Sequence, residues 1–248
     1  MTRRLGIDLG GSAIKAGVVD VTDGTLVSEV TTRPTPQPAT PELVAAAVSE
    51  LVADHPECTG AVGFAFPSVV TFGIARTAAN VDHAWIGCNG AQLILQHTGR
   101  RCGFLNDADA AGMAEMRFGA GRGVKGTVLT LTLGTGIGSA MFTDGLLWPN
   151  TELGHLEIHG VEAEHHASAR VRSAEHLDWD AWALRVNEVL DAYHKLLWPD
   201  LYIISGGVTE NWEIFGPKLR AGSPIRPAAL RQHAGVVGAA VYAAEQGE

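Results

Sequence analysis

The chain has 248 residues, of which 46% are hydrophobic and 18% charged, and this balance excludes a disordered chain or a coiled coil. Lys and Arg total 18 against 27 Asp and Glu, and the net charge of −9 argues against a nucleic-acid-binding protein, which usually carries a basic face. A small anionic substrate is not excluded, because a few backbone amides and arginines can hold a phosphate on an acidic protein. The 30 glycines predict loops that approach another group closely.

The cysteines and the apolar runs indicate the compartment. Cys58, Cys88 and Cys102 are widely separated, with neither a zinc-binding spacing nor an even number for disulfides. The longest apolar run, residues 236–244, is too short and too glycine-interrupted for a transmembrane helix, and no signal peptide is visible before Leu5. We therefore expect a cytoplasmic protein that does not bind a membrane.

Predicted strands and helices alternate along the chain, which is typical of an α/β protein. Strands are predicted over residues 5–9, 14–19, 61–66, 102–105, 128–133 and 201–204. Helices are predicted from Pro41 onward with Thr40 as the N-cap, from Asn106 to Gly119, from about Asp178 to Trp198, and from Gly235 to about Glu245.

The two halves of the chain contain similar glycine-rich segments. Residues 7–12 (IDLGGS) resemble residues 131–136 (LTLGTG), and in each half a second strand, an Asp (Asp20 or Asp144) and a turn follow. The offset, 132 − 8 = 124, is half the chain length. This similarity predicts two related lobes that face each other across a cleft. The alternative is coincidence, because short glycine-rich hairpins are common.

Each glycine-rich loop presents consecutive backbone N–H groups without a Cβ in the way, and such a nest can hold phosphate oxygens. A plain tight hairpin is the alternative for either loop alone. Asp8, at the end of the first strand, is positioned either to hold Mg²⁺ through water or to cap the turn. Lys15 either contacts phosphate or is a solvated strand lysine.

A second set of polar residues suits a substrate with many hydroxyls. Asp107 begins a predicted helix, where it is either a first-turn charge or the acceptor of a hydroxyl proton. Asn80 lies in a loop, and Glu152, His155 and Glu164 follow the second glycine-rich loop. Together with the two phosphate nests, these residues predict phosphoryl transfer to a sugar.

Four segments together resemble the ROK family of sugar kinases and repressors: residues 5–12 (LGIDLGGS), 106–111 (NDADAA), 133–138 (LGTGIG) and 152–155 (ELGH). Residues 76–82, 85–87, 149–157 and 227–231 resemble the polyphosphate glucokinase branch of that family. The resemblance covers nearly the whole chain. It implies an α/β, actin-like (ribonuclease H-like), two-lobed hexokinase fold with a central cleft. The expected N-terminal lobe is 1–106, with the C-terminal helix 235–248 packed on it, and the C-terminal lobe is 107–234.

The resemblance also implies an activity, namely phosphorylation of the 6-hydroxyl of glucose by inorganic polyphosphate, in some members also by ATP, with Mg²⁺. By position, Asp107 would be the general base. The sugar would be bound by Asn80, Asn106, Asp107, Glu152, His155 and Glu164. The donor phosphates and the metal would be surrounded by Asp8, Gly10, Gly11, Ser12, Lys15, Thr132, Gly134, Thr135 and Gly136, with Gly206 and Gly207 near a nucleotide base or the distal donor.

The chain departs from the family in two places. Many members carry a Cys-rich zinc loop after the Gly-His pair, but here only residues 161–164 lead to His165, so no structural zinc is expected. Ser68 stands where the family usually has Gly, which leaves the geometry of that loop open. An ATP-dependent hexose kinase and a non-catalytic sugar-binding regulator remain alternatives. Relatives also suggest a homodimer, formed through the helix that carries Trp182 and Trp198 unless that helix belongs to the core.

Overall fold

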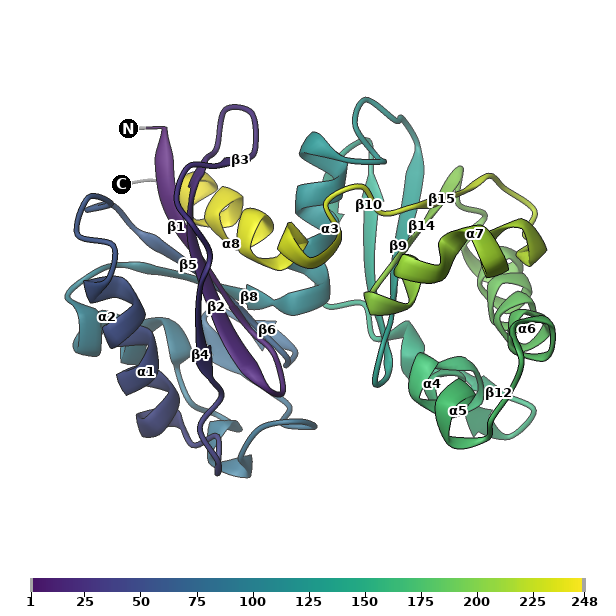
Figure 1. The fold of residues 1–248 in the computed structure, drawn as a ribbon, viewed down its shortest axis with the longest axis horizontal. Helices are drawn as coiled ribbons and strands as arrows, with labels where there is room; N and C mark the ends of the chain where they lie inside the picture. Colours follow the sequence, from purple (N-terminus) through teal and green to yellow (C-terminus); the bar gives the residue numbers. More distant parts are fainter. Residues whose placement is uncertain (1, 247–248) are drawn as a thin grey trace. The chain divides into compact units, whose positions relative to one another are not determined.

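The computed structural model describes residues 2–246 and divides into two compact units (Figure 1). Unit 1 comprises Met1–Ala114 and His233–Glu248, and unit 2 comprises Glu115–Gln232. The division falls inside helix α3 (Asp107–Phe118), whereas the predicted lobes divide after Asn106. Residues 247–248 of the predicted C-terminal helix lie outside the described residues.

Unit 1 is built on a six-stranded sheet with the order β3-β2-β1-β5-β8, in which β4 also pairs with β2. Its strands are β1 (Arg3–Leu9), β2 (Ala13–Asp20), β3 (Thr25–Leu26), β4 (Thr31–Pro34), β5 (Val62–Phe66) and β8 (Cys102–Asn106). The strands β1 and β2 form an antiparallel hairpin, and β1, β5 and β8 are parallel. A small hairpin of β6 (Val70–Thr71) and β7 (Ile74–Ala75) follows β5.

Unit 2 repeats this topology with the order β11-β10-β9-β14-β15. Its strands are β9 (Thr127–Leu133), β10 (Ile137–Thr143), β11 (Leu146–Trp148), β14 (Leu201–Ser205) and β15 (Ile225–Pro227), beside a small hairpin of β12 (Glu157–Ile158) and β13 (Val161–Glu162). An antiparallel β9–β10 hairpin again leads to parallel strands. The internal similarity in the sequence therefore corresponds to a repeated strand topology, with Asp8 and Thr132 each next to last in its strand.

Helices cover both faces of the unit 1 sheet (Figure 1). On one face lie α1 (Pro41–Ala53) and α2 (Gly90–Thr98), and on the other α8 (Ala234–Glu245). Gly6, Gly63 and Gly103 are register neighbours on β1, β5 and β8. A Cβ on either of the first two would overlap the backbone of α8, so glycine is what lets this helix lie directly on the sheet.

Helix α6 (Trp179–Leu197) supplies much of the core of unit 2. Asp178, where the helix was predicted to begin, is its N-cap and accepts the N–H of Ala181 at 2.8 Å, and Trp182 is fully buried against Phe215. Helical spacing of the apolar residues predicts that both Leu196 and Leu197 face the core. The prediction was wrong for Leu196, which is 63% exposed, and only Leu197 packs against the core at this end of the helix.

The remaining helices are short, apart from α3. They are α4 (Ala163–Ala167), α5 (Ala169–Ala174), α7 (Trp212–Phe215) and the 3₁₀ helices η1 (His83–Trp85), η2 (Leu153–His155), η3 (Gly207–Asn211), η4 (Gly216–Lys218) and η5 (Arg231–His233). Among the residues that the structure describes, no helix has the length and apolar character needed to span a membrane.

Candidate active site

In unit 1, the β1–β2 loop provides a small nest of free amides. The N–H of Gly10 closes the turn by donating to Ala13 O at 2.9 Å, and Thr35 Oγ1 donates to Gly10 O at 2.6 Å. The N–H groups of Gly11 and Ser12 find no acceptor within residues 2–246, and both residues are exposed. This loop therefore offers fewer unbonded N–H groups than the sequence predicts, because the N–H of Gly10 is used in the turn.

Asp8 has the environment of a carboxylate that faces a cation. It lies beside Gly235 at the start of α8, where a Cβ would lie 2.6 Å from Asp8 Cγ. Burial raises the pKa of Asp8 to about 6, and the charge of Lys15, its register neighbour on β2, acts in the opposite direction. No described residue donates a hydrogen bond to its carboxylate. A buried carboxylate without a donor suits a hydrated divalent cation, so these residues fit the expected Mg²⁺.

In unit 2, the β9–β10 loop repeats this arrangement. Gly134 N–H donates to Gly136 O at 3.0 Å, while the amides of Thr135 and Gly136 have no acceptor in the described part of the chain. Thr132 Oγ1 is buried without a hydrogen-bond partner. A buried hydroxyl in that state favours an additional polar group at this edge of the sheet.

Gly206 and Gly207 join this loop through strand pairing. Ser205, the last residue of β14, is the register neighbour of Thr132. Gly206 follows with φ of 99°, and a Cβ there would overlap Leu133 O, so only glycine fits. Gly207 has open space where a Cβ would be. The structure therefore brings the predicted donor residues of unit 2 to one edge of its sheet.

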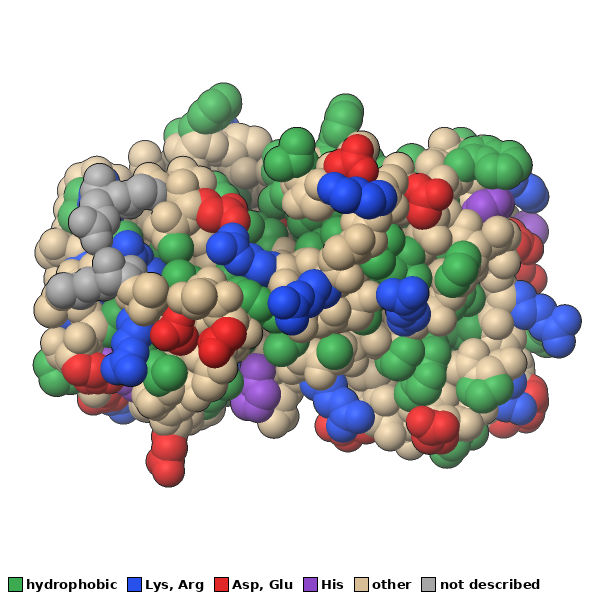
Figure 2. All heavy atoms as spheres, turned by 90° about the horizontal axis from the view of Figure 1, so that it is seen from above, with side chains coloured by type: hydrophobic (Ala, Val, Ile, Leu, Met, Phe, Trp, Pro, Cys, Tyr) green, Lys and Arg blue, Asp and Glu red, His purple; other side chains and the backbone are tan. Residues whose placement is uncertain are grey.

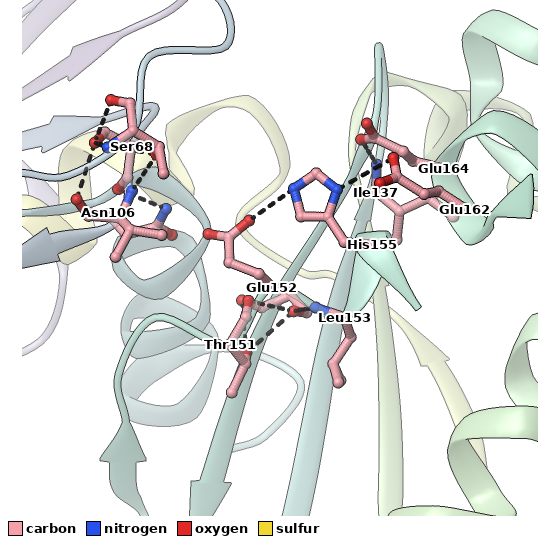
Figure 3. Close-up of polar contacts among 12 residues, drawn as sticks. Ser68, Asn106, Ile137, Thr151, Glu152, Leu153, His155, Glu162 and Glu164 are labelled. Atoms are coloured by element: carbon pink, nitrogen blue, oxygen red, sulfur yellow. Dashed lines mark hydrogen bonds and ion pairs between the residues drawn. The ribbon is translucent and has the colours of Figure 1, made fainter. Parts of the chain in front are cut away.

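The segment that carries Glu152 and His155 is fixed from two sides. Ser139 of β10 donates through Oγ to Thr151 O at 2.6 Å and accepts Leu153 N–H at 3.1 Å (Figure 3). Tyr193 of α6 donates its hydroxyl to Leu153 O at 2.7 Å. These bonds hold the backbone on either side of Glu152.

His155 lies between two carboxylates (Figure 3). Its Nδ1 is 3.3 Å from Glu162 Oε2, and its Nε2 is 3.7 Å from Glu152 Oε2. Desolvation lowers the pKa of His155, but the hydrogen bond to Glu162 and the charges of Glu162, Glu164 and Glu152 outweigh it, so the pKa is raised. Desolvation also raises the pKa of Glu152, against the opposing charge of His155. Ligand atoms of His155, Glu162 and Glu164 lie within 4.8 Å of one another, so the absence of structural zinc stays a prediction.

Glu164 connects this polar group to the glycine-rich loop of unit 2. Its Oε2 accepts the N–H of Ile137 at 3.4 Å. A Cβ on Gly136 would overlap the same Oε2. The loop predicted to hold phosphate and a carboxylate predicted to hold sugar are therefore in direct contact.

The polar residues of unit 1 form a second group around α3. Asn106 is buried; its Oδ1 caps α3 by accepting Asp109 N–H at 3.0 Å, and its Nδ2 donates to Ser68 O at 3.1 Å (Figure 3). Asp107 is partly exposed as the first residue of α3, and its Oδ1 accepts Ala108 N–H. Both residues thus also have a structural role, which for Asp107 is the first-turn alternative predicted from the sequence, and one Asn106 N–H is left for a ligand.

Ser68 has a clear role in the loop where the family usually has Gly. Its hydroxyl donates to Thr77 O at 2.8 Å, and Thr77 Oγ1 accepts the N–H of Val69 at 3.0 Å. The side chain therefore ties this loop to the segment that leads to Asn80, which is exposed.

Two basic residues of unit 2 lie away from its glycine-rich loop. Arg122 and Lys125 precede β9, whereas Gly134 follows it, and the seven residues of that strand separate them by about 20 Å. Lys218 is paired with Asp180 at 2.5 Å. On the described part of the face in Figure 2, Lys and Arg side chains are interspersed with acidic, neutral and apolar surface. Arg170, in contrast, is exposed and donates its backbone N–H to Gly134 O at 3.1 Å.

Comparison with known proteins accords with this geometry. The sequence pattern of the ROK family matches residues 4–174. The chain belongs to the ROK family. It is 47% identical over 237 residues to the polyphosphate glucokinase of Mycobacterium tuberculosis (strain CDC 1551 / Oshkosh), covering 95% of this chain and 89% of that one.

Solved structures give the same result. The inorganic polyphosphate/ATP-glucomannokinase of Arthrobacter sp. strain KM superposes with a TM-score of 0.95 at 47% identity, covering both chains completely. A ROK glucokinase from Streptomyces griseus, solved in complex with glucose and AMPPNP, gives a TM-score of 0.84 at 26% identity over 99% of this chain and 100% of that chain. The α/β, two-lobed hexokinase fold expected from the sequence is confirmed.

Sequence reasoning missed three residues that matter for these groups. Ser139 holds the Glu152 segment, Glu162 faces His155, and Arg170 contacts the glycine-rich loop. None carries a recognisable motif. Each acts through a contact between segments 7 to 36 residues apart (162 − 155 and 170 − 134) that sequence spacing does not reveal.

Proposed function

We propose that this chain phosphorylates the 6-hydroxyl of glucose, with inorganic polyphosphate as the donor and ATP as a second donor. The observation that carries the proposal is the 47% identity to a polyphosphate glucokinase over 95% of the chain. The 47% identity and TM-score of 0.95 to a polyphosphate/ATP-glucomannokinase support it further. Together with this, the glycine-rich loops and Asp107 are all present, which a non-catalytic sugar-binding regulator would not need.

In this proposal Asp107 is the general base. The glucose 6-hydroxyl oxygen forms a bond to the terminal phosphorus of the donor as the bond to the departing donor oxygen breaks. Asp107 orients the hydroxyl and accepts its proton late in the step. The products are glucose 6-phosphate and a polyphosphate shortened by one phosphoryl group, or ADP when ATP is the donor. The partly exposed position of Asp107 at the start of α3 supports its role as the base.

In this proposal six side chains bind the sugar hydroxyls. They are Asn80, Asn106, Asp107, Glu152, His155 and Glu164. Carboxylates accept hydrogen bonds from hydroxyl groups, and His155 and the remaining Asn106 N–H donate to hydroxyl oxygens. This mixture of acceptors and donors supports a polyhydroxylated substrate.

In this proposal the glycine-rich loop of each unit contributes residues that bind donor phosphate. In unit 1 the contributing residues are Asp8, Gly10, Gly11, Ser12 and Lys15, and in unit 2 they are Thr132, Gly134, Thr135, Gly136, Gly206 and Gly207. Asp8 would hold Mg²⁺ through water, and the ion would neutralise charge on the phosphoryl oxygens. We add Arg170, whose backbone N–H donates to Gly134 O and whose side chain is exposed, because a planar guanidinium suits phosphate oxygens.

The experiment that tests this proposal compares donors and sugars side by side. The purified chain is assayed for glucose 6-phosphate with polyphosphate and with ATP, each with Mg²⁺, and with mannose in place of glucose. Activity with polyphosphate supports the proposal, and activity with ATP alone favours an ATP-dependent hexose kinase. Glucose binding without phosphorylation from any donor favours a regulator.

Two further parts of the proposal have their own tests. We place the enzyme in the cytoplasm, which cell fractionation checks. We also propose a homodimer, with the exposed Trp198 (73% exposed) at the end of α6 as a contact, and light scattering with and without Trp198→Ser checks it.

A further inference from the structure

Glu162 is the closer of the two carboxylates that face the ring nitrogens of His155 (Figure 3). The distance from Nδ1 to Glu162 Oε2 is 3.3 Å, and that from Nε2 to Glu152 Oε2 is 3.7 Å. The partner of one ring nitrogen determines which nitrogen carries the proton of a neutral imidazole. With Glu162 as an acceptor, Nδ1 carries a proton, so Nε2, which is directed toward Glu152, is a donor only in the doubly protonated ring. The surrounding carboxylates Glu162, Glu164 and Glu152 favour that ring.

The backbone that carries Glu162 is fixed by the β12–β13 hairpin. Glu162 lies on β13, opposite Glu157 of β12, and the next residue, Ala163, donates its N–H to Leu156 O at 2.9 Å. The Glu162 side chain is 38% exposed. Its Oε2 also lies 3.5 Å from Nδ1 of His165, so two imidazoles compete for one oxygen.

We propose that Glu162 is a positioning residue for sugar binding: it fixes the orientation and protonation of His155, so that Nε2–H donates to one glucose hydroxyl while Glu152 accepts from its neighbour. This inference rests on the proposed function, in which Glu152 and His155 both contact the sugar. Glu162 itself does not touch glucose. It acts by making His155 a donor beside an acceptor, a pair that complements two adjacent hydroxyl groups.

The electrostatics of the group support this role. The charged groups that face His155 are Glu152, Glu162 and Glu164, and His165 lies across Glu162 and Glu164. Desolvation alone lowers the pKa of His155, and the hydrogen bond to Glu162 is the largest opposing contribution. Without that bond the pKa falls, so less His155 is protonated at neutral pH and Nε2 loses its hydrogen.

The test uses two substitutions of Glu162 and one matched control. Glu162→Gln keeps an oxygen that can accept from Nδ1 but removes the charge, and Glu162→Ala removes both. Glu157→Gln removes the same charge from the residue opposite on the two-stranded sheet, which is exposed. The KM for glucose and kcat are measured between pH 5.5 and 8.5, and the titration of the His155 ring is followed by NMR without substrate.

We expect Glu162→Gln to have a KM near wild type at pH 5.5, where His155 is protonated in both proteins. At higher pH, over the range in which only wild-type His155 keeps its second proton, the KM of the variant should rise by up to about tenfold, the effect of losing one hydrogen bond from a charged donor. Glu162→Ala should raise KM at both pH values, because the ring is no longer oriented. The control should retain the wild-type profile. In both Glu162 variants kcat at saturating glucose should change much less than KM.

An unchanged KM profile in Glu162→Gln, with the His155 titration also unchanged, would overturn the inference. A loss of kcat at all pH values with an unshifted titration would indicate a purely structural role and would overturn it equally. The NMR titration needs no substrate, so it separates failure of this inference from failure of the proposed function. A wild-type protein that phosphorylates no sugar contradicts the proposed function alone.

Discussion

Gly136→Ala tests whether the phosphate loop and the sugar-binding carboxylate act as one unit. A Cβ at this position would overlap Glu164 Oε2 and lie 3.3 Å from Glu164 Cδ. The carboxylate must therefore move, and the bond that it accepts from Ile137 N–H is broken. Since Glu164 is proposed to bind sugar and Gly136 to bind donor, a substitution in the donor loop should change the affinity for glucose.

The expected size follows from the broken bond. At 3.4 Å the bond from Ile137 to Glu164 is long, so we take the lower end of the range for hydrogen bonds to charged groups, about 1.5 kcal/mol. That free energy corresponds to about a tenfold increase in the KM for glucose. The upper limit is about 10²-fold, the loss that a displacement of about 1 Å can cause in a positioned group.

The assay is the initial rate of glucose 6-phosphate formation over a range of glucose concentrations at saturating donor. Gly134→Ala is the matched control for glucose affinity, because a Cβ at Gly134 meets nothing within 4 Å. We expect the control to leave the KM for glucose within about twofold, well below a tenfold, 1.4 kcal/mol effect. A KM for glucose that is equally unchanged in Gly136→Ala would refute the coupling through Glu164.

Three further predictions concern the base, the metal and the stability of unit 2. Asp107→Asn should lower kcat by about 10²- to 10⁴-fold with little change in the KM for glucose, and near-normal turnover by the folded variant would rule out Asp107 as the base. Asp8→Asn should raise the Mg²⁺ concentration needed for half-maximal rate in a titration after chelation, and an unchanged requirement would remove Asp8 from the metal site. Glu115 is fully buried and accepts the N–H groups of Leu230 and Ala229 at 2.7 and 3.0 Å, so Glu115→Gln should lower the free energy of unfolding by about 2 kcal/mol in urea titrations, whereas an unchanged midpoint would show that the carboxylate contributes nothing.

Local sequence signals predicted the elements of this fold well. Thr40 before Pro41 and Asp178 before Trp179 mark helix starts because a cap acts within one turn of backbone. The paired glycine-rich segments likewise predicted two equivalent hairpins, since a hairpin is defined by its own few residues. The loop, Asp107 and Glu152–His155 segments could be assigned roles because each carries a motif within a short stretch of chain.

Contacts between distant segments could not be predicted in this way. Only the structure shows that Gly10 uses its amide for the turn, that Glu164 fills the space beside Gly136, and that Arg122 and Lys125 lie at the far end of β9 from Gly134. The direction of a strand and the partner of a carboxylate depend on which elements pack together, and spacing along the chain does not encode this.

The glycines show most clearly which features the sequence determines and which depend on the tertiary structure. The sequence by itself determined that this chain is a two-part α/β protein of the ROK family, with glycine-rich loops suited to phosphate. Tertiary structure decided that Gly6 and Gly63 serve a different purpose, the close approach of α8 to the sheet of unit 1. A residue without a side chain looks the same in a loop and in a strand, and only the neighbour that occupies the missing Cβ shows why it is needed.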